Sequence, residues 1–338
     1  MTPGDYLDEA YDRLRDTGPE RDGWLSNHAP MAAEALTRRG DGRHVHRWID
    51  AYADLLEPRP RGIDPIDDEA WRDPLGDPVR AGDWIDYFER QAADGDWQTM
   101  LATWWPRLLP GIAAGATHGV IRVGHAVRAL SEQVTTPRVV ELAHGLAYWA
   151  ARWQPLAPAG RGLYRATDPR TALDAVPRVA DQRFGIRNRL AQLATTDRWA
   201  DAAGAVPGNG SSPERLTAIV AAAVLQYGTR GHGNPIMMVH AATAPNAVLR
   251  TLPFLPSTLW QPSLEAAWAA TAAVTAAYAP ADAWPAPLGD GLDPHEVMAR
   301  ATAHGDPHVI KFADTALDVA GDATLAAAVH AIELIPPD

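Results

Sequence analysis

One lysine and one histidine near the C-terminus are the residues best suited to chemistry. The chain has 30 lysines and arginines, and only one of them, Lys311, is a lysine. Asp306 and Pro307 are typical of a helix start, with a side-chain acceptor at the N-cap and a proline ring at the first helical position. His308 and Lys311 are three residues apart, so they would share one face of that helix. Because the neighbouring residues are mostly apolar, we expect Lys311 to be buried, and a buried lysine must be paired, neutral or chemically altered. The alternative is an ion pair, for which Asp314 is the nearest carboxylate on the helix.

Histidine is the other residue type that could carry chemistry. Neutral imidazole is the commonest metal-binding side chain, and the chain has no cysteine to compete with it. The alternative for each histidine is a core residue hydrogen-bonded to a carbonyl oxygen. Six of the 12 histidines lie in apolar or helix-terminal contexts and could converge: His28, His118, His125, His144, His240 and His308.

Spacing limits which of these histidines can bind one ion. His118 and His125 share a helix face but are separated by about 10.5 Å of helix rise, so we expect one to be a ligand and the other to face the substrate or support a ligand. His118 would lie at a helix start, after Gly115. His304 is separated from His308 by a helix break. The remaining histidines are predicted to be surface, packing or loop residues: His44, His46, His232, His295 and His330.

Composition excludes several classes of protein. The chain of 338 residues is 46% hydrophobic and has no cysteine, which excludes disulfides, thiolate metal sites and a thiol nucleophile. The net charge of −12 argues against a nucleic-acid partner. No membrane-spanning run or signal peptide is evident, so a cytoplasmic protein without a membrane partner is expected. Dinucleotide-binding, phosphate-binding and serine-nucleophile motifs are not found.

Helix signals recur along the chain, whereas alternating β-branched runs do not. Five proline-associated helix starts are predicted at Thr136, Ser212, Asn234, Asp293 and Asp306. Helices are predicted over residues 5–16, 31–39, 43–56, 82–94, 97–114, 118–133, 137–153, 181–202, 213–229, 235–251, 258–279, 294–303, 307–319 and 322–334. Long Pro/Gly-rich loops are predicted over 57–80 and 154–180. We therefore expect an all-α protein with a single large multi-helix domain over 1–338, in which a weak division could lie near 154–180, and any strands should be short and peripheral.

Four separated blocks together resemble the questin oxidase-like family, over about residues 5–320. They are Leu25–Leu36, Thr117–Leu130, Val239–Ala241 and His308–Lys311. The resemblance implies oxygenative ring opening of anthraquinone-type polyketides. For at least some members it also implies a non-haem iron held by four histidines and a carboxylated lysine.

Carried to this chain, the resemblance implies a metal bound by His28, His240, His308, one of His118 and His125, and Lys311. An amine next to a metal can add carbon dioxide and offer a carbamate oxygen as a ligand.

Three further features are predicted to face an aromatic substrate. Arg122, on the same helix as His118, could face a phenolate or quinone oxygen, and an ion pair with a carboxylate is the alternative. His125 is the second predicted catalytic residue. Four tryptophans could form an apolar slot, with helix packing as the alternative role: Trp104, Trp105, Trp149 and Trp153.

The function expected from these residues is oxidative ring cleavage, Baeyer–Villiger-like or dioxygenative, of an aromatic polyketide such as an anthraquinone. The cofactor would be non-haem iron, as Fe²⁺, and the partners would be a small aromatic substrate and O₂; a need for NADPH is left open. The alternatives are a metal-dependent hydrolase on a helical scaffold and a non-catalytic helical ligand-binding protein.

Overall fold

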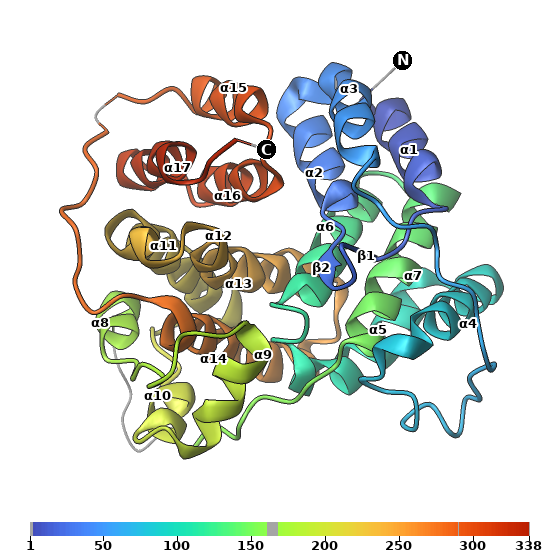
Figure 1. Cartoon of the computed structure of the whole chain (residues 1–338), viewed down its shortest axis with the longest axis horizontal. Helices are drawn as coiled ribbons and strands as arrows, with labels where there is room; N and C mark the ends of the chain where they lie inside the picture. The colour runs from blue at the N-terminus through green and yellow to red at the C-terminus, as the bar shows by residue number, and fades with distance from the viewer. Residues whose placement is uncertain (1–2, 161–167, 290, 338) are drawn as a thin grey trace. The chain divides into compact units, whose positions relative to one another are not determined.

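The computed structural model describes residues 3–160, 168–289 and 291–337, and their regular structure is almost entirely helical (Figure 1). The strands in these ranges form a two-stranded antiparallel hairpin, β1 (Glu20–Arg21) and β2 (Leu25–Ser26). The prediction of an all-α protein with short strands is confirmed. No helix in the same ranges is both long enough and apolar enough to cross a membrane.

The chain divides into two compact units. The first unit comprises residues 1–154 and 253–256, and the second comprises residues 155–252 and 257–338. The first boundary falls at the start of the connection 154–180, where the sequence predicted a weak division. A single domain over residues 1–338 stays a prediction.

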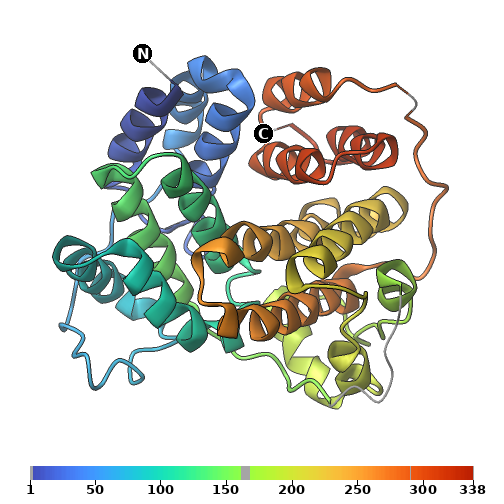
Figure 2. The same cartoon turned by 180° about the vertical axis from the view of Figure 1, so that it is seen from behind.

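In the first unit, helix α7 packs against both α4 and α6 (Figure 2). The helices are α1 (Pro3–Leu14), α2 (Ala29–Leu36), α3 (Gly42–Ala53), α4 (Ala81–Asp94), α5 (Trp97–Leu108), α6 (His118–Glu132) and α7 (Thr136–Ala151), with a π turn at Thr37–Asp41 and 3-10 turns at Pro78–Arg80 and Leu109–Gly111. A Cβ on Gly119 would lie 2.6 Å from the Cβ of Trp149. Only glycine allows this approach, which fixes the first turn of α6 against α7.

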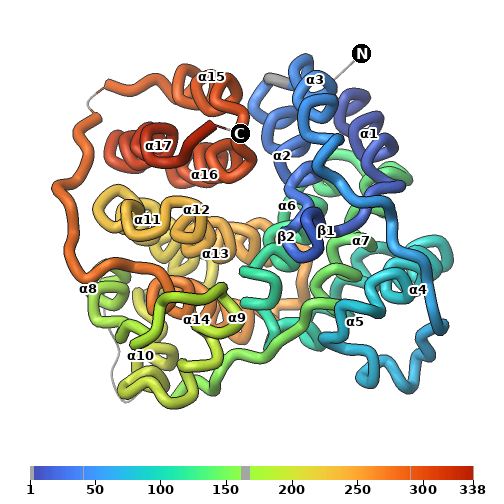
Figure 3. Tube along the Cα trace, in the orientation of Figure 1, coloured from blue at the N-terminus to red at the C-terminus, as the bar shows by residue number. Residues whose placement is uncertain are grey.

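In the second unit, α13 packs against α11 and α14, and α17 packs against α11 and α16. The helices are α8 (Pro169–Asp174), α9 (Ile186–Ala191), α10 (Trp199–Gly204), α11 (Ser212–Arg230), α12 (Pro235–Met238), α13 (His240–Thr251), α14 (Trp260–Tyr278), α15 (Pro294–His304), α16 (Pro307–Asp318) and α17 (Asp322–Leu334), with 3-10 turns at Gln192–Thr195, Gly231–Gly233 and Ser257–Leu259. A further 3-10 turn, Leu252–Phe254, begins at the last residue before the short segment 253–256 of the first unit. The connection between α14 and α15 follows the outer edge of this unit (Figure 3).

Helix α13 continues through a proline because a neighbouring helix supplies a donor. Pro245 has no N–H to bind the carbonyl of Ala241, one turn earlier. The hydroxyl of Thr271, on α14, donates to that carbonyl at 3.1 Å. This hydrogen bond joins α13 to α14 and satisfies the carbonyl that Pro245 leaves without an intrahelical donor.

Predicted helix starts agree with the structure where the cap is local. Asn234, Asp293 and Asp306 are N-caps whose side chains accept backbone N–H groups. The other two predicted starts are wrong by one residue. Helix α7 has Thr135 at its N-cap, and α11 has Ser211 there, in a capping box with Glu214.

Three predicted elements differ from the structure. The helix predicted over 181–202 is wrong: α9, a 3-10 turn and α10 occupy this stretch, because Thr196 is extended and Arg198 takes a left-handed φ of 60°. The loop predicted over 154–180 contains α8, which Asp168 caps, while residues 161–167 of that loop lie outside the described ranges. The helix predicted over 235–251 is interrupted between α12 and α13.

Candidate functional site

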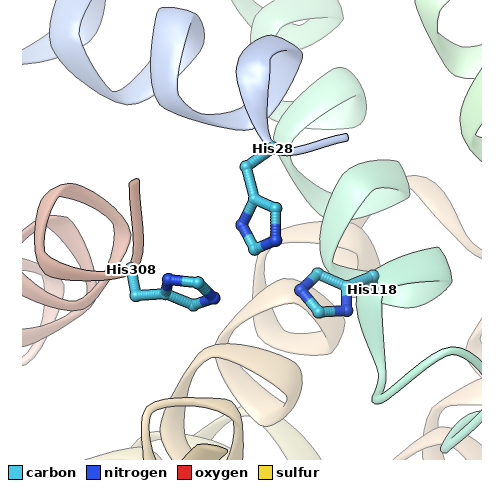
Figure 4. A group of neighbouring side chains, drawn as sticks. All are labelled: His28, His118 and His308. Carbon is cyan, nitrogen blue, oxygen red and sulfur yellow. The ribbon is translucent and has the colours of Figure 1, made fainter. Parts of the chain in front are cut away.

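Two histidines of the first unit lie together. His28 directly precedes α2, and His118 is the first residue of α6; their ring centroids are 4.6 Å apart and the rings meet edge to face (Figure 4). Asn27 fixes the entry to α2, because its side chain accepts from the backbone N–H of Ala29 at 2.9 Å and donates to the carbonyl of Gly18 at 2.9 Å. The turn before His28 is thereby tied to the β-hairpin region.

The ring of His118 has a defined tautomer. Its Nδ1 lies 2.6 Å from the carbonyl oxygen of Gly115. A carbonyl oxygen can only accept, so Nδ1 carries the proton and the lone pair of the neutral ring is on Nε2.

His125 lies elsewhere on α6, in a buried cluster of charged groups. Its Nδ1 donates to Glu34 at 2.6 Å, and Arg128 donates to the other oxygen of Glu34 at 2.7 Å. Burial alone would raise the pKa of Glu34, but Arg128 and His125 outweigh it and lower the pKa to about 2. Within the first unit, the structure therefore brings His118 beside His28, while His125 is held by the ionised Glu34.

Arg122 is bound to a carboxylate inside the first unit. Its Nε and Nη2 donate to the two oxygens of Glu141 at 2.6 and 2.7 Å, and both side chains are buried. Burial alone would lower the pKa of Arg122, but Glu141 outweighs it and raises that pKa. This is the ion pair that the sequence offered as the alternative, and a catalytic role for Arg122 stays a prediction.

The ring of His144 has the opposite tautomer to that of His118. Its Nε2 donates to Glu89 at 2.9 Å, so the lone pair of the neutral ring is on Nδ1. Burial lowers the pKa of His144, so the ring is neutral over most of the physiological range. The hydrogen bond to Glu89 explains this buried histidine without a bound metal.

Two histidines of the second unit also lie together. His240 is the first residue of α13, and its Nδ1 donates to the carbonyl of Met237 at 3.1 Å. His308 is the second residue of α16, and its Nδ1 lies 3.2 Å from the carboxylate of Asp306. The ring centroids of His240 and His308 are 5.6 Å apart. The pKa of His240 is well below its ordinary value because the ring is buried and lies near the charges of His308 and Lys311.

Lys311 is buried on the same helix, with 0% of its surface exposed. Burial lowers the pKa of Lys311 from 10.5 to about 7, against the opposing effect of Asp306. Asp314, the partner proposed in the alternative, accepts from Arg250 at 2.6 Å. A large share of Lys311 side chains is therefore neutral at neutral pH, the form that can react with carbon dioxide.

The four tryptophans predicted as slot walls have packing contacts in the first unit. Trp104 meets Trp84 and Phe88, and Trp105 meets Trp149. The indole N–H groups of Trp149 and Trp153 donate to backbone carbonyls. These contacts correspond to the packing role that was the alternative.

Two carboxylates with defined roles were missed from the sequence, Glu34 and Glu141. Glu34 stands in an otherwise apolar helical stretch, which is the signal that could have revealed a buried and paired charge. The discounted His304 binds the carbonyl of Ile335 at 2.9 Å, in agreement with a packing role.

Fold and side chains together define an all-α protein with buried histidines whose Nδ1 atoms donate to oxygen, and with one buried lysine. The family model described as Questin oxidase-like matches residues 25–316. The chain therefore belongs to the questin oxidase-like family, and the resemblance seen in the sequence is confirmed. The curated proteins compared with the chain include no match. Family membership indicates an oxidoreductase, an oxidase of anthraquinone-type substrates.

Proposed function

We propose that this protein is a non-haem iron oxygenase that cleaves a ring of an aromatic polyketide such as an anthraquinone. The family supports the oxidase class. The observation that carries the iron proposal is the shared arrangement of His118, His240 and His308, each of which donates from Nδ1 to an oxygen atom. Histidine ligands of metals typically make such a bond, which directs the Nε2 lone pair to the ion.

The donor set fits iron. Neutral imidazoles suit Fe²⁺, and thiolates are absent from the sequence. In this proposal the metal ligands are the histidines that the family resemblance implies, His28, His118, His240 and His308. His125 has the same Nδ1 arrangement through Glu34 and serves as the acid–base group.

Lys311 completes the proposed set as a carbamate. Its neutral amine adds carbon dioxide at the nitrogen, a new N–C bond forms, and one proton is released to the solvent. The product carries a negative charge on oxygen, which a cation binds as it would bind a glutamate. The burial of the amine favours this reaction because burial disfavours the ammonium form.

Bound iron would supply the activation of O₂. The chain's own residues supply proton handling: the Nε2 lone pair of His125 can accept the proton of a phenol, while Glu34 stabilises the resulting imidazolium. Arg122 stays charged, with Glu141 as its counter-ion.

Elemental analysis of protein purified without a histidine tag tests the proposal. We expect about one iron per chain, together with O₂ consumption when an anthraquinone is added. Bound metal without O₂ consumption would favour a hydrolase, and protein without metal would favour a binding protein; either result contradicts the proposal. Replacing His118 or His240 with Gln should each remove all of the metal, because both are proposed ligands of one ion. Partial loss in each variant would indicate two separate sites.

Lys311→Arg is the sharpest substitution. Guanidinium keeps the positive charge but cannot form a carbamate, so iron content and O₂ consumption should both fall to background. Lys311→Ala should also lose iron, and added acetate should restore part of it. Full iron occupancy in Lys311→Arg would exclude the carbamate.

A further inference from the structure

The turn before α6 is left-handed over three consecutive residues. Gly115, Ala116 and Thr117 have φ values of 53°, 57° and 66°. A left-handed conformation brings the Cβ of an L-residue close to the following carbonyl, and it is unusual above all for a β-branched residue such as threonine. In the described ranges, only two other residues besides glycines have positive φ, Asp22 and Arg198.

This strained turn presents one carbonyl group to His118. The oxygen of Gly115 accepts the backbone N–H of His118 at 3.2 Å and the ring Nδ1–H at 2.6 Å. Thr117 is fully buried, and a Cβ on Gly115 would lie 3.1 Å from the hydroxyl of Tyr148. The turn is therefore closely packed at both its first and its last residue.

We propose that the turn at Gly115–Thr117 is a positioning device for His118. Its left-handed residues direct the Gly115 carbonyl at Nδ1, which fixes the tautomer and orients Nε2. Backbone strain of this kind persists only where surrounding contacts impose it. Glycine at position 116 would adopt the same φ without strain but would give a looser turn. The inference rests on the proposed function, because the lone pair on Nε2 is the proposed metal donor.

Ala116→Gly tests this role, and Arg198→Gly is the matched control. Both substitutions relieve a left-handed residue close before a helix: Ala116 lies two residues before α6, and Arg198 lies directly before α10, which carries none of the candidate histidines. The first readout is the ¹⁵N–¹H imidazole spectrum of metal-free, histidine-labelled protein, in which the signal absent from His118→Gln identifies His118. The second readout is Fe²⁺ affinity measured without oxygen.

In wild type and Arg198→Gly, we expect the His118 signal of a fixed Nδ1–H tautomer and equal Fe²⁺ affinity. In Ala116→Gly, we expect a signal averaged over both tautomers and an affinity about 10-fold lower or more, as when a partner of a ligand is lost. An unchanged Nδ1–H signal in Ala116→Gly overturns the proposal, whatever the metal does. If the wild type binds no Fe²⁺, the proposed function fails, and the imidazole spectrum alone still decides whether the turn positions His118.

Discussion

The pair of Arg122 and Glu141 allows a quantitative test. The two nitrogen–oxygen distances of 2.6 and 2.7 Å join side chains that are only 5% and 6% exposed. Unit charges about 4 Å apart attract each other by about 4 kcal/mol at an effective dielectric constant of about 20. Removing one partner of a buried pair costs about 3–5 kcal/mol, because the other charge stays buried and uncompensated. Glu141→Gln should therefore lower the free energy of unfolding by about 3 kcal/mol, since the amide oxygen can still accept one hydrogen bond.

Urea unfolding of four proteins measures this energy: wild type, Glu141→Gln, Arg122→Met and the double variant Arg122→Met/Glu141→Leu. The free energy of unfolding of the double variant should lie within about 1 kcal/mol of the wild-type value, or above it, because the double variant buries no uncompensated charge. A loss below about 1 kcal/mol in Glu141→Gln would refute the reasoning. O₂ consumption by the double variant with an anthraquinone then tests the catalytic prediction: a folded but inactive double variant supports contact between Arg122 and the substrate.

Two further predictions concern the helices of each unit. Thr271→Val should lower the free energy of unfolding by about 1–3 kcal/mol, because it removes the hydroxyl that donates to the carbonyl of Ala241. The loss should be smaller in a Pro245→Ala background, which restores the backbone N–H, and equal losses in urea unfolding would contradict this account. The pKa of Glu89 is lowered from 4.5 to about 2 because His144 donates to it, so the stability it contributes is present above pH 4.5 and is lost as the pH falls towards 2. The difference in urea midpoint between wild type and Glu89→Gln should shrink between about pH 5 and about pH 3, and a constant difference would argue against the linkage.

Helix starts were predictable where the signal is local. Asp306 caps α16 through its own side chain, so the sequence placed His308 and Lys311 on that helix correctly. The stretch 181–202 was only partly predictable in this way: Gly185, the N-cap of α9, is a signal inside the predicted helix, whereas the later break depends on the left-handed backbone of Arg198. The small α8 was hidden within a proline-rich connection, although Asp168 and the following Pro169 give the usual cap signal.

The candidate site was predictable as a set of residue types but not as an arrangement. The spacing of His118 and His125 on one helix predicted that they do not both bind one ion. Which of the two lies near His28 depends on where the start of α2 lies, and the sequence does not give this position. Within the first unit, the structure places His28 beside His118, and the ligand role of His118 stays a prediction. The roles of Glu34 and Glu141 were not evident, since each binds a residue some 20 to 90 positions away in the sequence.

The burial of Lys311 has a practical consequence for labelling. A reagent that acylates amines meets only one ε-amino group in this chain, and that group is fully covered. Acylation of this amine requires transient opening of the structure around α16. The rate at which the acyl group is incorporated therefore measures the frequency of that local unfolding. A ligand that stabilises this helix would lower the acylation rate of Lys311. Mass spectrometry of the one peptide that contains Lys311 would measure this rate without any engineered probe.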